Sequence, residues 1–276
     1  METRLGKRST VDIQVKYDNL VDYLRSMDSL VVAFSGGVDS SFLLYAAKDA
    51  LGEMAVAYTT ASPYHLQWEI CESMDLVKRI GVKQVVQKQD MILPEMRNNP
   101  PDRCYVCKKA LFTEILMYAD EHGFGCVADG TNADDRADYR PGMKALQELK
   151  IKSPLLEMGF TKEDIRTISQ EVGLPTWSKP AYACLLSRIP YGQKITIEDL
   201  RRIEKAELYL LDLGFKAVRV RLHGDVARIE VSTEERERLF DEVLLDRIAE
   251  EMKGFGFRYV TLDLQGYRMG SLNEGL

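Results

Sequence analysis

Apolar and polar positions follow two different rhythms along this chain. In the first half, short apolar runs predict strands at residues 30–34, 54–59, 82–86 and 126–129. The segments between them repeat apolar residues at helical spacing, which predicts helices that begin after Asp39 and that cover residues 66–80 and 108–121. Strands that alternate with helices in this way pair in parallel, with helices on both faces of the sheet. The first half therefore predicts an α/β fold with a doubly wound parallel sheet.

The pattern changes after about Pro190. A capping-box segment at residues 161–164 begins the last helix before that point. Beyond it, the sequence predicts an α-β-β-α-β unit, with its helices and strands at residues 197–213, 217–222, 226–231, 234–252 and 258–264. We therefore expect two domains, residues 1–190 and 191–276, of which the second is a small α+β domain.

The composition fits a folded protein and narrows its partners. The chain has 276 residues, of which 45% are hydrophobic, and no run approaches the ~20 apolar residues that a membrane span needs. Residues 1–17 are polar and basic, without the hydrophobic region of a secretory signal. We therefore expect a cytoplasmic protein without a membrane partner. The net charge of −6 argues against a nucleic-acid partner, because phosphate neutralisation needs clustered Lys and Arg.

The cysteines are more informative by spacing than by number. A count of five, without a secretory signal, argues against a disulfide framework. Cys71 lies in a helical pattern and Cys126 starts an apolar run, so both are expected to be buried thiols. Cys104 and Cys107 form a CxxC motif, whereas Cys184 stands alone. The CxxC suits a thioredoxin-like dithiol, and a zinc site would need a fourth ligand that the three histidines do not offer by spacing.

The sharpest local signal is the segment Ser35-Gly36-Gly37-Val38-Asp39-Ser40-Ser41, which follows the first strand. Two glycines let the backbone turn tightly and approach a ligand. The following helix presents unpaired N–H groups and the positive end of its dipole to an anion. The serine hydroxyls can donate hydrogen bonds, and Asp39 suits a magnesium ion or a capping role. An ordinary strand-to-helix turn rich in small residues is the alternative.

A second loop, residues 129–135, leaves the fourth strand at the same edge of the predicted sheet. The two loops resemble the SGGxDS and GTNxDD loops of the PP-loop ATP pyrophosphatase superfamily, whose members cleave ATP to AMP and pyrophosphate. The resemblance implies magnesium ligands at Asp39 and at Asp135, with Asp134 as the other candidate in the second loop; a solvated turn is the alternative for the two acids of that loop. The ATP-binding residues that it implies are Ser35, Gly36, Gly37, Asp39, Ser40, Gly130 and Asn132.

Five further segments narrow the resemblance. They are residues 138–142, 187–192, 219–223, 225–230 and 259–264. Together with the two loops they resemble the LarE family of ATP-dependent sulfur transferases over nearly the whole chain. The resemblance implies a small nucleotide substrate, a pyridinium-3,5-dicarboxylate mononucleotide, whose carboxylates are adenylylated and become thiocarboxylates during nickel-pincer nucleotide biosynthesis. It also implies a sulfide donor and a homo-oligomer, for which a hexamer would fit.

Family members differ in how they supply sulfur. One form sacrifices a single cysteine at the position of Cys184, whereas this chain also has Cys104 and Cys107, as the three-cysteine variants do. The resemblance therefore implies a 4Fe-4S cluster held by three thiolates, with the fourth iron open to sulfide. Sacrifice of Cys184, with the other two thiols as bystanders, stays open as an alternative.

Charged residues beside these motifs complete the expected site. Lys108 follows the CxxC directly, and Ser187 and Arg188 follow Cys184 closely. Cationic neighbours stabilise thiolates and attract anions, although both cations would also suit a surface. The resemblance places Arg219 and Arg221 at a phosphate and Glu230 near a metal, whereas their strand pattern alone fits a solvated sheet face.

Two other classes of function stay open. A tRNA thiolase shares the phosphate loop and a three-cysteine cluster, but it would need a basic, aromatic-lined face. A non-thiolating amide synthetase or a regulatory AMP-binding module would leave the thiols incidental. The sequence therefore favours an ATP-dependent, AMP-forming sulfurtransferase over both.

Overall fold

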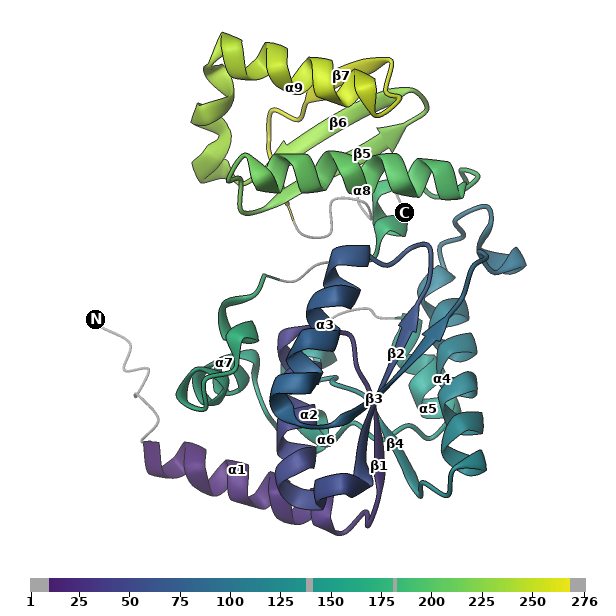
Figure 1. The fold of residues 1–276 in the computed structure, drawn as a ribbon, viewed down its shortest axis with the longest axis vertical. Coiled ribbons are helices and arrows are strands. Elements are labelled where there is room, and N and C mark those ends of the chain that lie inside the picture. Colours follow the sequence, from purple (N-terminus) through teal and green to yellow (C-terminus); the bar gives the residue numbers. More distant parts are fainter. Residues whose placement is uncertain (1–9, 138–140, 181–182, 269–276) are drawn as a thin grey trace. The chain divides into compact units, whose positions relative to one another are not determined.

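The computed structural model describes residues 10–137, 141–180 and 183–268. Contacts divide the chain into two compact units (Figure 1). The first unit contains α1 (Thr10–Arg25), β1 (Leu30–Ala33), α2 (Val38–Leu51), β2 (Ala55–Ala61), α3 (Gln67–Ile80), β3 (Lys83–Lys88), α4 (Arg103–Glu121), β4 (Cys126–Ala128), α5 (Pro141–Glu148), α6 (Pro154–Glu157) and α7 (Lys162–Glu171). The second contains α8 (Ile197–Asp212), β5 (Val218–His223), β6 (Val226–Val231), α9 (Glu242–Gly254) and β7 (Tyr259–Leu262).

The first unit is built on a four-stranded sheet of order β3-β2-β1-β4, in which every pairing is parallel. Leu30 of β1 lies opposite Ala55 of β2 and Cys126 of β4. All four strands therefore end at the same edge of the sheet. The loops after β1 and β4 leave neighbouring strands at this edge, where α/β folds bind their ligands.

Helices cover both faces of this sheet (Figure 1), and each face has its own hydrophobic core. Successive residues of a strand point to opposite faces. Leu30 and Val32 of β1 accordingly pack with residues of α1, α2 and α7, whereas Val31 packs with Val127 and with residues of α4 and α5. The prediction of a doubly wound α/β sheet is confirmed.

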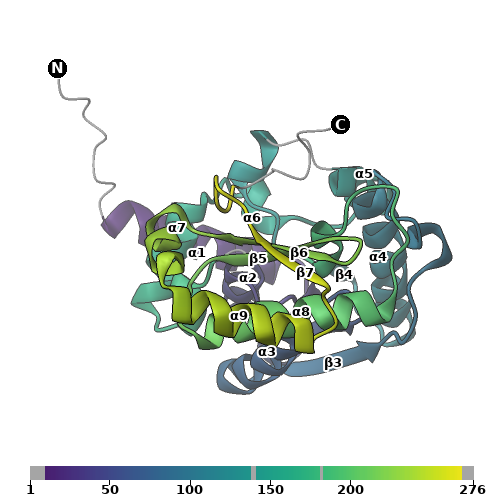
Figure 2. The same cartoon turned by 90° about the horizontal axis from the view of Figure 1, so that it is seen from above.

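The second unit is a three-stranded sheet with two helices on one face (Figures 1 and 2). The strand order is β5-β6-β7; β5 and β6 form an antiparallel hairpin, and β7 pairs in parallel with β6. Apolar residues of α8, such as Leu200, Ile203 and Leu210, are fully buried. The α-β-β-α-β order agrees with the prediction from sequence.

Several local predictions need correction. The helix expected at residues 234–252 is interrupted, because Asp241 caps α9: its carboxylate accepts the Leu244 N–H at 3.0 Å, and a 3₁₀ segment precedes it. Helix α4 begins at Arg103, so the CxxC lies in its first turns. Cys71 is exposed, since it lies on the outer side of α3, and Cys126 is only partly buried. Helix α1 was not anticipated.

The second unit consists of the chain from Ala183 onward together with two earlier segments, residues 62–66 and 90–103. Asn99 explains part of this division, because its buried amide donates to the carbonyls of Leu186, Ile189 and Pro190. Two compact units do not by themselves show that each folds independently. The domain boundary between residues 190 and 191 therefore stays a prediction. Within the described ranges, none of the helices is long and apolar enough to cross a membrane.

Candidate active site

The loop after β1 forms a tight cradle at the start of α2. Gly36 has a φ of +73°, which favours glycine, and a Cβ there would lie 2.9 Å from the Cβ of Ser73 in α3. The hydroxyls of Ser35 and Ser40 lie 3.1 Å apart across the turn, and Ser35 Oγ also accepts the Gly37 N–H. Helix α2 begins directly after this turn, and a helix leaves its first N–H groups without intrahelical partners, an arrangement that suits phosphate.

The loop after β4 packs directly against this cradle. A Cβ on Gly130 would lie 2.9 Å from the backbone nitrogen of Ser40, so only glycine fits there. The buried amide of Asn132 donates to Asp39 Oδ1 at 3.2 Å, which joins the two loops. Asp135 Oδ2 accepts the Asn132 N–H at 3.0 Å. The structure therefore brings together the two loops that the sequence singled out.

Lys162 was missed by the sequence analysis. It is the first residue of α7, and its ammonium donates to Asp39 Oδ2 at 2.5 Å. The N–H of Lys162 in turn donates to Asp134 at 2.8 Å, so α7 is tied to the second loop. A cation thus lies beside the phosphate cradle. Nothing in the local sequence distinguishes it from any lysine at the start of a helix.

Lys108 extends from α4 toward the end of β4. Its stem lies so close to Gly142 that a Cβ there would come within 2.7 Å of Lys108 Cδ. Its ammonium lies 3.8 Å from the carboxylate of Asp129, which also accepts hydrogen bonds from Thr131 and Ser153. The Lys108 side chain is about one-third exposed, so the ammonium is oriented but remains accessible.

The segment after Cys184 is organised by a buried arginine. The guanidinium of Arg188 is completely buried and donates to the carbonyls of Ala183 and Cys184 and to Ser187 Oγ. Its other nitrogens donate to both carboxylate oxygens of Glu207 at 2.7–2.8 Å. Arg188 therefore holds the backbone around Cys184, and its alternative as a surface charge is wrong.

Glu207 was not predicted, although a signal existed. It lies on the stripe of α8 that carries Ile203 and Leu210, where a charged residue needs a partner. Besides Arg188, its carboxylate accepts the Val220 N–H at 2.9 Å. A carboxylate within the apolar stripe of a helix was thus the feature of the sequence that indicated a buried ion pair.

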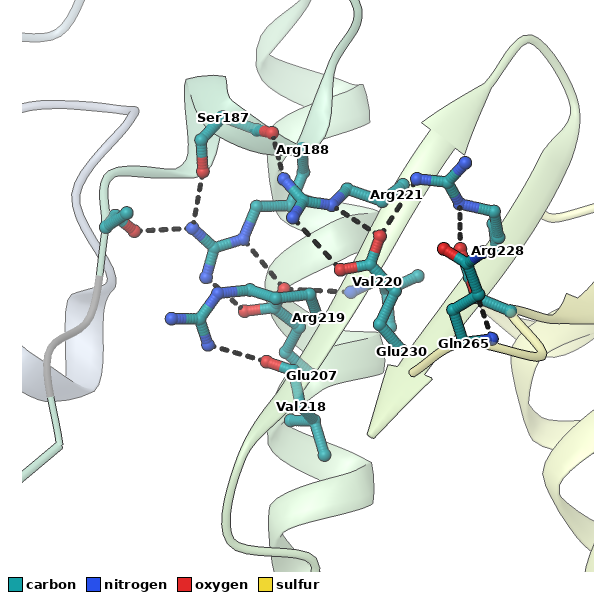
Figure 3. A network of polar contacts seen from close by, with 12 residues as sticks. Ser187, Arg188, Glu207, Val218, Arg219, Val220, Arg221, Arg228, Glu230 and Gln265 are labelled. Atoms are coloured by element: carbon teal, nitrogen blue, oxygen red, sulfur yellow. Dashed lines mark hydrogen bonds and ion pairs between the residues drawn. The ribbon is translucent and has the colours of Figure 1, made fainter. Parts of the chain in front are cut away.

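Three more arginines lie in the same cluster (Figure 3). Arg221 donates to both oxygens of Glu230 at 3.0 Å and to the Ser187 carbonyl at 2.5 Å. Arg228 also donates to Glu230, at 2.9 Å. Arg219 and Arg221 are more than nine-tenths buried, as is Glu230. The solvated-face alternative for these strands is therefore wrong.

Among the described residues of this cluster, four arginines, Arg188, Arg219, Arg221 and Arg228, lie with three carboxylates, Glu207, Glu230 and Asp263. Burial and the nearby charge of Arg188 lower the pKa of Arg219. Burial by itself would also lower the pKa of Arg188, but the charge and hydrogen bonds of Glu207 raise it above the ordinary value. The Arg219 guanidinium stacks at 4.8 Å from the ring centre of Tyr267. Guanidinium groups that lie close together are suited to an anion such as phosphate.

Relatives of known name show the family. No family model matches the chain. An uncharacterized protein of Synechocystis is 42% identical over 265 residues, which are 96% of this chain and 99% of that protein. Pyridinium-3,5-bisthiocarboxylic acid mononucleotide synthase of Lactiplantibacillus plantarum is 38% identical over 267 residues, 96% of each chain. The chain belongs to this family, LarE.

Other relatives agree with the LarE assignment. An uncharacterized protein of Methanocaldococcus jannaschii is 31% identical over 239 residues, 87% of this chain and 90% of that protein. An argininosuccinate synthase, a tRNA-specific 2-thiouridylase and a GMP synthase are 23–25% identical over parts of the chain. The predicted resemblance to LarE and the PP-loop fold class are thus confirmed, and LarE relatives are ATP-using enzymes of this superfamily.

The sulfur side of the LarE site stays a prediction. No disulfide joins any two of the five cysteines, all of which lie within the described residues. Cys104 and Cys107 lie in the first unit and Cys184 in the second. Among the residues that the structure describes, no group of three His, Cys, Asp or Glu side chains forms a ready metal site. Residues 138–140, which belong to one of the resembling segments, lie outside the described residues, as do residues 181–182.

Proposed function

We propose that this protein is an ATP-dependent sulfur transferase that converts the carboxylates of a pyridinium-3,5-dicarboxylate mononucleotide into thiocarboxylates. One observation carries the proposal: the chain matches a pyridinium-3,5-bisthiocarboxylic acid mononucleotide synthase over 96% of both chains. The phosphate cradle at the start of α2 agrees with it. Such a reaction needs ATP, because an anionic carboxylate is a poor electrophile.

In the first step, the substrate carboxylate attacks the α-phosphorus of ATP, which forms an acyl-adenylate and releases pyrophosphate. The N–H groups at the start of α2 and the hydroxyls of Ser35 and Ser40 would hold the phosphates. Magnesium, when bound at Asp39 and Asp135, would offset their charge. Lys162 would also bind the phosphates, because its contact with Asp39 holds its ammonium beside the phosphate cradle. Exclusion of water protects the mixed anhydride.

In the second step, sulfide attacks the acyl carbon, which forms the thiocarboxylate and releases AMP. We assign Cys104, Cys107 and Cys184 as the thiolates for a 4Fe-4S cluster, because thiolates are the usual ligands of such a group and no disulfide occupies these cysteines. The cluster, when bound, would supply an iron to hold sulfide. Lys108, next to Cys107 in the sequence, would offset negative charge on the thiolates. Arg188, whose charge is paired with Glu207, would hold the Cys184 carbonyl and the Ser187 hydroxyl in place.

Chain connectivity supports this grouping of thiols. Arg103 immediately precedes Cys104, and its guanidinium donates to Asn99 and stacks over Tyr191. Asn99 in turn donates to three carbonyls in residues 186–190, which closely follow Cys184. The chain entering the CxxC and the chain leaving Cys184 therefore share one set of contacts in the second unit.

The substrate phosphate is assigned to Arg219 and Arg221. Their buried cluster has the charge and the donors that a phosphate monoester needs. Glu230 is proposed near a metal, although both of its oxygens accept from guanidinium groups in this structure. A cytoplasmic location and a homo-oligomer, with a hexamer as one form, belong to the same proposal.

The test is a complete reaction under anaerobic conditions. Protein reconstituted with iron and sulfide is mixed with ATP, magnesium, sulfide and the dicarboxylate mononucleotide, and products are separated by mass spectrometry. We expect AMP, pyrophosphate and exchange of carboxylate oxygen for sulfur. AMP without thiocarboxylate would favour an amide synthetase, and salt-sensitive tight binding of bulk tRNA would favour a tRNA thiolase.

A second test addresses the three thiols separately. Single Cys→Ser variants at residues 104, 107 and 184 are reconstituted and analysed for iron, sulfide and visible absorption. Each variant is expected to lose cluster absorption, because each removes one ligand, whereas Cys71→Ser, an exposed thiol outside the site, is the matched control. Full iron content in all three variants would contradict the assignment and would leave sacrifice of Cys184 as the alternative.

A further inference from the structure

The chain that enters α7, residues 159–164, is held by Lys16 of α1. The Lys16 ammonium donates to the carbonyl of Gly159 at 2.7 Å and to Asp164 Oδ2 at 2.6 Å. It also lies 4.7 Å from the ring centre of Phe160. The Lys16 side chain is 21% exposed and that of Asp164 is 4% exposed, so this ion pair is largely withdrawn from water. One cation of α1 therefore contacts both ends of this segment.

The carboxylate that Lys16 contacts also closes the capping box of α7. Asp164 Oδ2 accepts the Thr161 N–H at 3.1 Å, and Thr161 Oγ1 accepts the Asp164 N–H at 3.2 Å. A capping box fixes the path of the chain into a helix. Because a buried carboxylate needs a cation or hydrogen-bond donors, Lys16 stabilises Asp164 in the position that closes the box. The first turn of α7 is thereby tied to α1.

The same segment contacts the nucleotide site. The carbonyl of Phe160 accepts the Ala133 N–H at 2.8 Å, and the N–H of Lys162 donates to Asp134 at 2.8 Å. Both acceptances join the segment to the loop after β4. The buried ring of Phe160 lies 5.5 Å from that of Phe42 in α2. Residues 159–164 are therefore packed between α1 and the two elements that form the phosphate cradle.

These contacts place the ammonium of Lys162. It donates to Asp39 Oδ2 at 2.5 Å, while Asp39 Oδ1 accepts from the Asn132 amide. The Lys162 side chain is 38% exposed, so its ammonium remains accessible to a ligand. Magnesium at Asp39, as in the proposed function, would compete with Lys162 for this carboxylate. The backbone of the first turn of α7, which Lys16 and Asp164 hold, would then keep Lys162 beside the phosphates.

We propose that Lys16 is a positioning residue for ATP binding: through Asp164 it fixes the first turn of α7 and thereby the reach of the Lys162 ammonium toward the phosphates. The inference rests on the proposed function, in which Lys162 binds the phosphates of ATP. It assigns Lys16 no contact with the nucleotide. Its consequence is that replacement of Lys16 weakens ATP binding only while Lys162 is present.

The experiment measures the Kd for ATP with magnesium, by calorimetry, for the whole chain and three variants. Lys162→Met is expected to raise the Kd at least about tenfold, because it removes a charged donor to phosphate. Lys16→Met is expected to raise it about fivefold, because a displaced ammonium makes a longer and weaker contact. The variant with both substitutions should bind no more weakly than Lys162→Met, since Lys16 acts through Lys162. Lys16→Arg, which keeps the charge, should restore most of the affinity.

Tyr17→Phe is the matched control. Tyr17 is the next residue of α1, and its hydroxyl donates to Asp49 of α2 at 3.1 Å. The substitution therefore removes a polar contact of α1 but leaves the contacts of Lys16 with α7 in place. We expect Tyr17→Phe to lower the urea midpoint of unfolding without a change in the Kd for ATP. A purely structural role of Lys16 would give the same result for Lys16→Met.

The outcomes separate the proposals. If the wild type does not bind ATP, the proposed function fails and the role of Lys16 fails with it. If the wild type binds ATP and Lys162→Met keeps its Kd, ATP use stands but the positioning role is overturned. The same follows if Lys16→Met keeps the wild-type Kd or if the two effects multiply in the combined variant. Should Lys16→Met not fold, Asp164→Asn, which removes the charge and keeps an acceptor for Thr161, takes its place in the same comparison.

Discussion

We expect that breaking the buried ion pair of Arg188 and Glu207 strongly lowers the free energy of unfolding. We consider Glu207→Leu, which removes the charge and keeps a similar volume. The Arg188 side chain is completely buried and that of Glu207 is 4% exposed, so water cannot replace the lost partner. Three donors lose their acceptor: Arg188 Nε, Arg188 Nη2 and the Val220 N–H.

The magnitude follows from these three contacts. A hydrogen bond to a charged group contributes about 1.5–3 kcal/mol, and a buried unpaired donor costs about 1–3 kcal/mol. Removal of one partner from a buried ion pair costs about 3–5 kcal/mol in total, because the remaining charge stays uncompensated. We therefore expect Glu207→Leu to lower the free energy of unfolding by about 4 kcal/mol. Arg188→Leu/Glu207→Leu should lose clearly less than the sum of the two single variants.

Urea denaturation followed by circular dichroism measures this free energy. Arg201→Ala is the control, because Arg201 and Glu204 form a more exposed ion pair on the same helix, and such pairs contribute about 0–1 kcal/mol. A loss below about 1 kcal/mol for Glu207→Leu, or additive single variants, would refute the reasoning. It would mean that Arg188 finds other acceptors or that water reaches it.

Three further outcomes are expected. Gly130→Ala should weaken ATP binding, measured by calorimetry, because its Cβ would meet the Ser40 nitrogen at 2.9 Å; Gly125→Ala, whose nearest neighbour lies at 3.7 Å, should not, and equal affinities would contradict the close approach. The paired Arg219→Ala and Arg221→Ala substitutions should weaken binding of the nucleotide substrate but not of ATP; unchanged substrate affinity would disprove the phosphate assignment. Burial and the charges of Arg228 and Arg221 lower the pKa of His223 below 6.5. The unfolded chain therefore binds the proton first, and stability should fall as the pH drops from about 7 through 6.5 toward the lowered pKa. His223→Gln should make the free energy of unfolding, measured by urea denaturation, depend less on pH in this range. An unchanged dependence on pH would contradict the assignment of the effect to His223.

Much of the first unit follows from local pattern. The strand at residues 30–33 is apolar at every position because it is the second of four parallel strands from one edge and is covered on both faces. The capping box at Thr161 and Asp164 forms as predicted, since both hydrogen bonds are made within four residues. Such patterns depend only on residues that are close in the sequence, so they predict local structure without knowledge of the fold.

Errors arose where distant segments compete with a local preference. The helical pattern at residues 234–252 contains a second start signal, Asp241, and the structure begins α9 there instead of at residue 234. Burial of Cys71 was expected from its place in a helix, but the sheet-facing side of α3 is made by Ser73, Leu76 and Val77, which leaves Cys71 exposed. Helical spacing predicts that one face of a helix is buried, but it does not determine whether a residue at the margin of that face, such as Cys71, is buried or exposed.

The amino-acid sequence by itself determined the order of strands and helices, the phosphate loop and the membership in the LarE family, because these depend on spacing and on short motifs. Only the tertiary structure decided which charged side chains pair with one another. Arg188 and Glu207 are 19 residues apart, and Lys162 is 123 residues from Asp39. Their pairing is set by the packing of whole helices and strands, since a buried charge is tolerated only where the fold delivers a partner.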